Sequence, residues 1–321
     1  MSKHSFKNVR HFKKYEQETR GTNEKEWIMS PNQELCLYKV TQIKDDNTST
    51  NAHYAECIYY EIATLLNVEC AKVELAKINK NKGIISHYFL NDEEELIDFN
   101  ALIQNIRQDY IPKGLKCKHS KDYYSITLIL EAVKSVVYKR EEYKKIRKKI
   151  MKLIIMDALC DHYDRNSSNI ALIRNYTKTP DKQFRLAPIY DNGTSLAISL
   201  PTPISKMYLE SENGIIDLDN AIISKIGVGN RFATYTELLN FIFDKYFDDC
   251  IDIINKIDKN INETNLINII FDSKYKDLDK YHKKLMLLKV LYNKEKILNI
   301  YQKHIEQNHK IKRKVINDKQ R

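Results

Sequence analysis

Residues 160–173 read CDHYDRNSSNIALI, and residues 186–194 read LAPIYDNGT. The first stretch is a polar loop that follows a helical pattern over 143–159 and leads into an apolar strand pattern over 169–174. The second stretch continues a further strand pattern, over 183–187, and becomes polar where that pattern ends. Both stretches place acidic side chains where strands begin or end, so we expect their carboxylates to converge at one rim of a sheet.

These two stretches carry the residue types that phosphoryl transfer needs. A carboxylate must orient the attacking hydroxyl and accept its proton, and Asn and Asp oxygens must hold Mg²⁺, which prefers hard oxygen donors and bridges the phosphates. Kinases supply these groups as Asp-x-x-x-x-Asn on a loop, then a strand pair, then Asp-Phe-Gly. Asp164 and Asn169 have that five-residue offset, and Asp191 opens an Asp-Asn-Gly in the corresponding place. The pattern predicts an ATP-dependent phosphotransferase with a catalytic loop in 161–171 and a metal-binding segment in 186–194.

A second register of the loop has the same spacing, because Asp161 and Asn166 are also five residues apart. The metal-binding Asn should directly precede the strand that leads away from the site, and only Asn169 does so. We therefore prefer Asp164 and Asn169, and we expect Asp161 to cap or orient the loop. The plain alternative is that Asp, Asn and Ser fill this loop because they form caps and turns. The position of Asp191 after a short strand pair, in the chain order of a kinase, favours the catalytic interpretation.

The rest of the chain changes character near residue 91. The expected strands are 27–29, 35–40, 71–78 and 83–89, and the expected further helices are 52–66, 93–106, 123–138, 217–226, 234–247, 250–261 and 276–305. A β-rich part followed by a helical part predicts an α+β, two-lobed protein-kinase-like fold, with a small, mainly β N-lobe and a larger, mainly α C-lobe. The predicted division is a basic N-terminal segment (1–20), an N-lobe (21–90) and a C-lobe (91–321).

Length and composition set limits on the class of protein. The 321 residues are 42% hydrophobic, and no window approaches the roughly 20 apolar residues that span a bilayer. The first 20 residues are polar throughout, without the apolar stretch of a signal peptide, so we expect a cytoplasmic protein without a membrane partner. The six cysteines stand singly, which favours reduced structural thiols over a zinc or redox site.

The charge balance is basic, with a net charge of +10. Such a charge is compatible with a polyanionic partner, but 53 basic residues face 43 acidic ones and the excess gathers at the chain ends. We interpret the basic C-terminal tail as a solvated terminal helix. A non-catalytic nucleic-acid-binding module remains an alternative, although no helix-turn-helix or stacked aromatic motif is present.

The loop 164–169 resembles the Asp-Arg-His-x-x-Asn loop of the HipA-like serine/threonine kinases, with Asn166 in place of the usual His. Residues 187–193 resemble the family's Ala-Pro-hydrophobic-aromatic-Asp-Asn-Gly segment. The resemblance, to a short stand-alone member of the family, implies that Asp164 is the catalytic base and that Asn169 and Asp191 bind Mg²⁺. His162 could take the place of the missing His from a neighbouring position.

The resemblance extends to the first half of the chain and implies an ATP site there. Lys39 matches the strand lysine that contacts ATP phosphates, and Glu56 matches the helix glutamate that pairs with it. The run that begins with Gly21 and Thr22 resembles the phosphate-covering loop. Tyr88, Phe89 and Leu90 fall where the hinge between the lobes should bind adenine through backbone groups.

The resemblance implies a protein serine/threonine kinase that uses ATP and Mg²⁺, acts on a protein substrate and is compatible with autophosphorylation. It also allows an antitoxin-type partner, which no residue pattern indicates. A small-molecule phosphotransferase of the aminoglycoside type uses a similar Asp/Asn/Asp set. That class typically has His-Gly-Asp in the loop, whereas residues 161–164 read Asp-His-Tyr-Asp.

Overall fold

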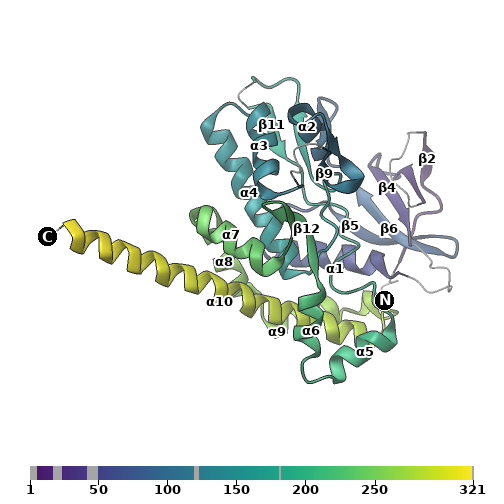
Figure 1. Ribbon diagram of the computed structural model, residues 1–321. Coiled ribbons are helices and arrows are strands. Elements are labelled where there is room, and N and C mark those ends of the chain that lie inside the picture. The colour runs from purple at the N-terminus through teal and green to yellow at the C-terminus, as the bar shows by residue number, and fades with distance from the viewer. Residues whose placement is uncertain (1–5, 17–23, 42–49, 119–122, 181, 320–321) are drawn as a thin grey trace.

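The computed structural model of the chain describes residues 6–16, 24–41, 50–118, 123–180 and 182–319, without the side chains of Lys113 and of residues 308–319. Gly21 and Thr22, which the sequence assigns to the phosphate-covering loop, lie outside the described residues. A β-sheet forms one side of the molecule and helices form the other (Figure 1).

The N-terminal sheet has six strands in the order β1-β5-β6-β4-β3-β2. Their bounds are β1 Lys7–Asn8, β2 Lys13–Tyr15, β3 Lys25–Met29, β4 Leu35–Val40, β5 Val73–Ile78 and β6 Asn81–His87. Helix α1, Ala52–Leu65, covers one face, because apolar side chains of α1 and of alternate sheet positions share one buried cluster. The strands and helix predicted for residues 27–89 are confirmed within a few residues of their expected bounds.

Strands β1 and β2 come from the basic N-terminal segment and form the two edges of this sheet. The sequence does not reveal them because they are two and three residues long, too short for a periodic pattern. Between them, Val9 and Phe12 are buried against the sheet face that α1 does not cover, together with Tyr38.

The helix predicted over residues 93–106 is wrong in its first half. Glu94–Asp98 is strand β7, which pairs with β10 (Ala171–Asn175), and β10 also pairs with β11 (Phe184–Leu186). Helix α2, Phe99–Ile106, begins only afterwards, where the Asp98 side chain accepts a hydrogen bond from the Ala101 amide at 3.0 Å. Pairing with a strand that lies far along the chain overrides the local helical preference of these residues.

Helices build most of the remaining chain. Their bounds are α3 Ile126–Val136, α4 Arg140–Leu159, α5 Thr202–Glu210, α6 Gly214–Ala221, α7 Tyr235–Lys245, α8 Phe247–Asn260, α9 Glu263–Ile270 and α10 Lys280–Lys319. Short 3₁₀ turns occur at Pro112–Gly114 (η1) and Ser273–Tyr275 (η2). One small hairpin pairs β8 Tyr110–Ile111 with β9 Lys116–Cys117. A second pairs β12 Ile223–Val228 with β13 Arg231–Thr234. The helix predicted over 217–226 therefore ends early, since Ile223 begins a strand.

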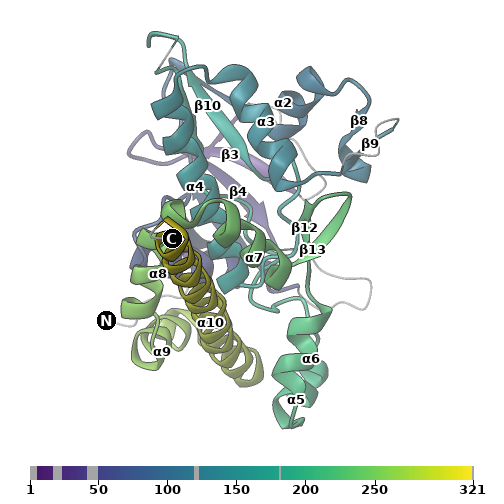
Figure 2. The same ribbon diagram turned by 60° about the vertical axis from the view of Figure 1, so that its left-hand side comes forward.

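Helix α4 passes through the centre of the helical part, and the residues of its second half are almost all buried. The long helix α10 crosses this part and projects away from the body (Figure 1), and in Figure 2 its C-terminal end points toward the viewer. None of the described helices is long and apolar enough to cross a membrane. The predicted α+β, two-lobed architecture, with a mainly β N-lobe and a mainly α C-lobe, is confirmed.

Candidate active site

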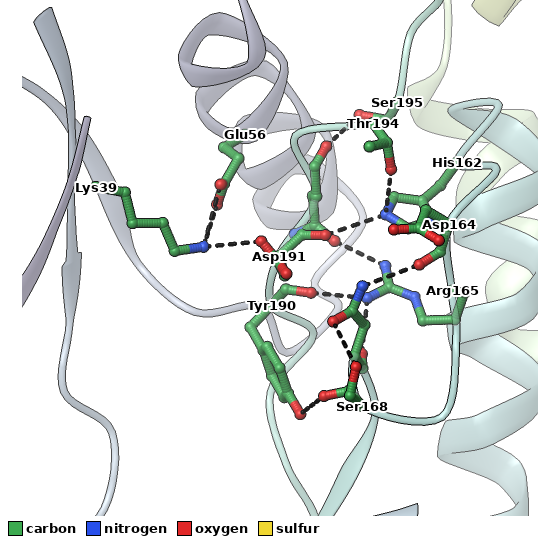
Figure 3. Close-up of polar contacts among 12 residues, drawn as sticks. Lys39, Glu56, His162, Asp164, Arg165, Ser168, Tyr190, Asp191, Thr194 and Ser195 are labelled. Carbon is green, nitrogen blue, oxygen red and sulfur yellow. Dashed lines mark hydrogen bonds and ion pairs between the residues drawn. The ribbon is translucent and has the colours of Figure 1, made fainter. Parts of the chain in front are cut away.

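Three charged side chains from distant parts of the chain meet between the sheet and the helical part (Figure 3). Lys39 Nζ on β4 lies 3.2 Å from Glu56 Oε1 on α1 and 3.0 Å from Asp191 Oδ1, which belongs to the segment after β11. The Lys39 side chain is 17% exposed, whereas that of Asp191 is 45% exposed. The structure thus joins the predicted lysine–glutamate pair to one of the predicted metal ligands.

Electrostatic interactions within this trio stabilise the charged forms of Lys39 and Asp191. Burial by itself would lower the pKa of Lys39, but Glu56 and Asp191 outweigh burial and raise that pKa above its usual value. Burial raises the pKa of Glu56, although Lys39 opposes this effect. The positive charge of Lys39 lowers the pKa of Asp191, which keeps that carboxylate ionised and able to bind a cation.

Lys25, the last residue of the run 21–25 that resembles the phosphate-covering loop, is a further cation beside this trio. It lies on β3 directly opposite Lys39 in the antiparallel register. Burial, followed by the charge of Lys39, lowers the pKa of Lys25. The expected strand began at residue 27, whereas β3 begins at Lys25, so the sequence did not place Lys25 opposite Lys39.

The loop after α4 brings Asp164 and Asn169 into contact. The Asn169 amide donates through Nδ2 to the Asp164 backbone carbonyl at 2.9 Å, so the two residues are held together. Asn166 Nδ2 lies 3.3 Å from Asp164 Oδ1. Asn166, at the position of the usual family His, therefore contacts the carboxylate of the predicted base.

Asp161 occupies a different environment and is almost fully buried. Its carboxylate lies 3.3 Å from Lys289 Nζ and accepts a hydrogen bond from Asn293 Nδ2 at 2.8 Å, both on α10. Asp161 also has a left-handed backbone, with φ of 52°. These contacts fix the start of the loop against the last helix, as expected for a residue that orients the loop.

Arg165 connects the parts of the site and is fully buried. Its Nε and Nη2 donate to the two oxygens of Asp157 on α4, each at 2.8 Å. Its Nη1 donates to the backbone carbonyls of Asn169, at 3.0 Å, and Tyr190, at 2.7 Å. One guanidinium nitrogen therefore holds both the loop that ends at Asn169 and the residue before Asp191.

The sequence did not reveal the role of Arg165 and Asp157, although a signal was present. Asp157 is the one charged residue in the apolar run 153–160. A carboxylate is rarely buried without a partner, so an acid in such a run implies a nearby cation. The adjacent loop offers Arg165 eight residues later.

The Asp-Asn-Gly segment has a fixed backbone shape. Asp191 is left-handed, with φ of 60°, and its carbonyl lies 3.1 Å from Nε2 of the buried His162. Burial, helped by the charge of Arg165, lowers the pKa of His162. A neutral imidazole donates through only one nitrogen, so Nε2 carries the proton that the Asp191 carbonyl accepts. His162 thus holds the backbone of Asp191 in place.

Gly193 allows this segment to lie against α1. A Cβ at Gly193 would lie 3.1 Å from the Ala52 Cβ and 3.5 Å from Glu56 Oε1. A Cβ here would be closer to Ala52 than most side-chain contacts, so α1 or the segment that carries Asp191 would have to shift by a few tenths of an ångström.

The predicted hinge residues follow β6 at the junction between the sheet and the helical part. The Tyr88 amide donates a hydrogen bond to the Leu35 carbonyl at 3.0 Å, so it is not available to bind adenine. Phe89 and Leu90 pack against a small buried cluster of β10 and β11 neighbours, and the Phe89 ring stacks on Tyr190. Among the described residues, the backbone groups of Phe89 and Leu90 make no hydrogen bond, so they could bind an adenine edge.

The oxygen atoms of Asn169 and Asp191 fit a magnesium ion that also binds phosphates. The Asn169 NH₂ group donates to the Asp164 carbonyl, and its Oδ1 has one long contact, from Ser168 Oγ at 3.5 Å. Asp191 Oδ2 has no hydrogen bond within the described residues. No three His, Cys, Asp or Glu side chains in the described ranges form a complete metal site. Mg²⁺ characteristically needs only one or two carboxylates together with substrate phosphates and water.

Comparisons with known proteins agree with this architecture. The sequence matches the HipA-like C-terminal domain over residues 7–254, and no curated protein sequence matches it significantly. The structure is similar to that of CtkA, a proinflammatory kinase of Helicobacter pylori, at 19% identity and a TM-score of 0.75, over 93% of this chain and 98% of that one.

It is also similar to HipA of Shewanella oneidensis MR-1, solved with HipB and operator DNA, at 12% identity and a TM-score of 0.55. This match covers 90% of the chain but only 65% of HipA. The likenesses establish a kinase-like fold, and the match over residues 7–254 shows that the chain belongs to the HipA-like C-terminal domain family.

Proposed function

We propose that the protein is an ATP- and Mg²⁺-dependent protein serine/threonine kinase in which Asp164 is the catalytic base. The observation that carries this proposal is the contact of Lys39 with both Glu56 and Asp191, at 3.2 and 3.0 Å. Active protein kinases require a strand lysine paired with a helix glutamate beside a metal-binding aspartate. In this chain Lys39 contacts both Glu56 and Asp191, which match that glutamate and that aspartate.

In the proposed reaction, the chain's own residues bind and orient the reactants. Lys39, with Lys25 beside it, neutralises the phosphates of ATP, and the backbone of Phe89 and Leu90 binds adenine. Asn169 and Asp191 hold Mg²⁺, which would supply charge neutralisation on the phosphate oxygens.

Asp164 accepts the proton of the substrate serine or threonine hydroxyl. The oxygen of that hydroxyl forms a bond to the γ-phosphorus of ATP. The bond from that phosphorus to the β–γ bridging oxygen breaks, and ADP leaves. Arg165 keeps the loop and the Asp-Asn-Gly segment in one geometry, and such positioning is a large part of catalysis of phosphoryl transfer.

The test is transfer of label from γ-labelled Mg-ATP to a generic protein acceptor and, separately, to aminoglycosides. Loss of a general base typically costs roughly 10²–10⁴-fold, so Asp164→Ala should lower turnover by that order. Asp258→Ala, at an exposed position on α8, should leave turnover unchanged. Asp161→Asn should lower the melting temperature but leave the turnover of the folded fraction much closer to wild type.

Two results would contradict parts of the proposal. Full activity of Asp164→Ala together with an inactive but folded Asp161→Asn would show that the other register of the loop is the catalytic one. Label that appears only on the small molecule would replace the protein substrate with a small-molecule acceptor.

A further inference from the structure

A cavity of about 780 Å³ lies outside the candidate active site, between α1, β5 and the turn η2. Cys57, Tyr60 and Glu61 line it from α1, the helix that carries Glu56. Val73 and Leu75 line it from β5. None of the residues proposed to bind ATP, metal or the reacting hydroxyl belongs to its wall.

The acidic side chains of this wall already have cationic partners. Glu74 lies 3.2 Å from Lys7 Nζ, and Asp272 lies 3.9 Å from Lys274 Nζ. Glu61 lies 2.5 Å from Lys274 Nζ and accepts a hydrogen bond from the Tyr275 hydroxyl at 2.7 Å. Their negative charge is therefore largely neutralised within the wall.

Lys77 is a cation in the wall without such a partner. It makes no ion pair with any residue in the described part of the chain, and its ammonium stays free for a ligand. Because side chains alternate along a strand, Lys77 lies on the same face of β5 as Val73 and Leu75, the face that packs against α1. This positive charge thus lies beside the apolar side chains of β5, in a wall that also contains aromatic and charged side chains.

We propose that this cavity binds a small amphipathic anion, with a flat apolar body and one carboxylate, sulfonate or phosphate group that pairs with Lys77. Its volume lies in the range of small-molecule sites, and its wall combines apolar and aromatic side chains with several charged ones. Tyr60 and the β5 side chains contact the apolar body. The anion replaces water around an ammonium that has no counter-charge among the residues that the structure describes.

Occupancy of the cavity regulates phosphotransfer through α1, and this part rests on the proposed function. Cys57 directly follows Glu56, and the other α1 residues of the wall lie within the next five positions. Helix α1 is also tied to the helical part through Glu61 and Tyr275. A ligand that binds one position of α1 better than another shifts the population in which Glu56 reaches Lys39.

The experiment uses 1-anilinonaphthalene-8-sulfonate as the probe and its uncharged analogue N-phenyl-1-naphthylamine as the matched ligand. Fluorescence titration of the full chain should show one saturable site for the sulfonate. Lys77→Glu should weaken its binding by about tenfold or more, the usual effect of losing a charge-assisted contact. Lys80→Glu, an exposed change of equal charge at the end of the same hairpin, should leave the affinity unchanged. The uncharged analogue should bind all three proteins alike.

Phosphotransfer is measured in parallel at saturating sulfonate. The KM for Mg-ATP should change at least twofold in wild type and not in Lys77→Glu. Lys77→Gln provides a second variant, with the same expected loss of the charge-dependent part of binding, should the charge reversal lower the melting temperature.

Equal sulfonate affinity of wild type, Lys77→Glu and Lys77→Gln would overturn the site, as would displacement of the probe by Mg-ATP. A Lys77-dependent site whose occupancy leaves the KM unchanged would overturn the regulatory role. Lys77-dependent binding to a chain without any phosphotransfer would instead refute the proposed kinase function while the site stands.

Discussion

Replacing Arg165 by Met should separate the structural and functional parts of the site. Arg165 is fully buried, and its guanidinium donates to both oxygens of Asp157 and to three further acceptors, among them the carbonyls of Asn169 and Tyr190. The substitution keeps an apolar stem of similar shape but leaves the Asp157 carboxylate buried without its cation. Breaking a buried ion pair in this way costs about 3–5 kcal/mol.

A loss of this size should lower the melting temperature on the order of 10 °C in a chain of this length, as measured by thermal unfolding. Arg174→Met is the matched control, because Arg174 is 41% exposed and its ion pair to Glu95 is 3.8 Å long. Exposed pairs are worth about 0–1 kcal/mol, so this variant should melt close to wild type.

The double variant Arg165→Met with Asp157→Leu removes both buried charges and should recover part of the lost stability. It should not recover phosphotransfer, because the Asn169 and Tyr190 carbonyls still lack their shared donor. Small displacements of catalytic groups can lower rates on the order of 10²-fold. Equal melting temperatures for the two single variants, or full turnover by the double variant, would refute this account of Arg165.

Three further changes test other parts of the structure. Gly193→Ala should raise the KM for Mg-ATP severalfold and lower the free energy of unfolding by about 1–3 kcal/mol through overpacking. Gly114→Ala should change neither quantity, because a Cβ at Gly114 would meet only side chains, at 3.6 Å or more. Lys39→Met should lower kcat/KM for Mg-ATP about 10²-fold in the same transfer assay, since it removes a charge that stabilises the transferring phosphoryl group. Burial lowers the pKa of His53 to about 3, so the neutral ring contributes stability that is present above pH 6.5 and lost as the pH falls toward 3. Urea unfolding between pH 6.5 and 5 should therefore show a smaller loss of unfolding free energy with falling pH for His53→Gln than for wild type. The two slopes should differ by up to about 1.4 kcal/mol per pH unit. Equal slopes would contradict the buried neutral state of His53.

Much of the sheet and of the helices could be predicted because their signals are local. Helix α1 and strands β3 to β6 have periodic apolar patterns within single segments, and the structure has them close to the expected bounds. Strand β7 was mistaken for helix because its identity depends on β10, a partner that follows far along the chain. Strands β1 and β2 were missed because edge pairing, rather than a pattern of their own, makes them strands.

The sequence alone determined which chemical groups the site contains, since side-chain identity and spacing are written in short motifs such as 164–169 and 191–193. It did not determine which of those groups are buried, paired or free. Asp161 and Asp164 are equivalent by spacing to an Asn; the position of Asn169 before a strand favours Asp164, and the tertiary structure shows how differently the two carboxylates are placed. Asp161 lies against Lys289 of the last helix, whereas Asp164 stays partly exposed beside Asn169. Charge pairing is decided by distance in space, and distant segments come within a few ångströms of each other only when the chain is folded.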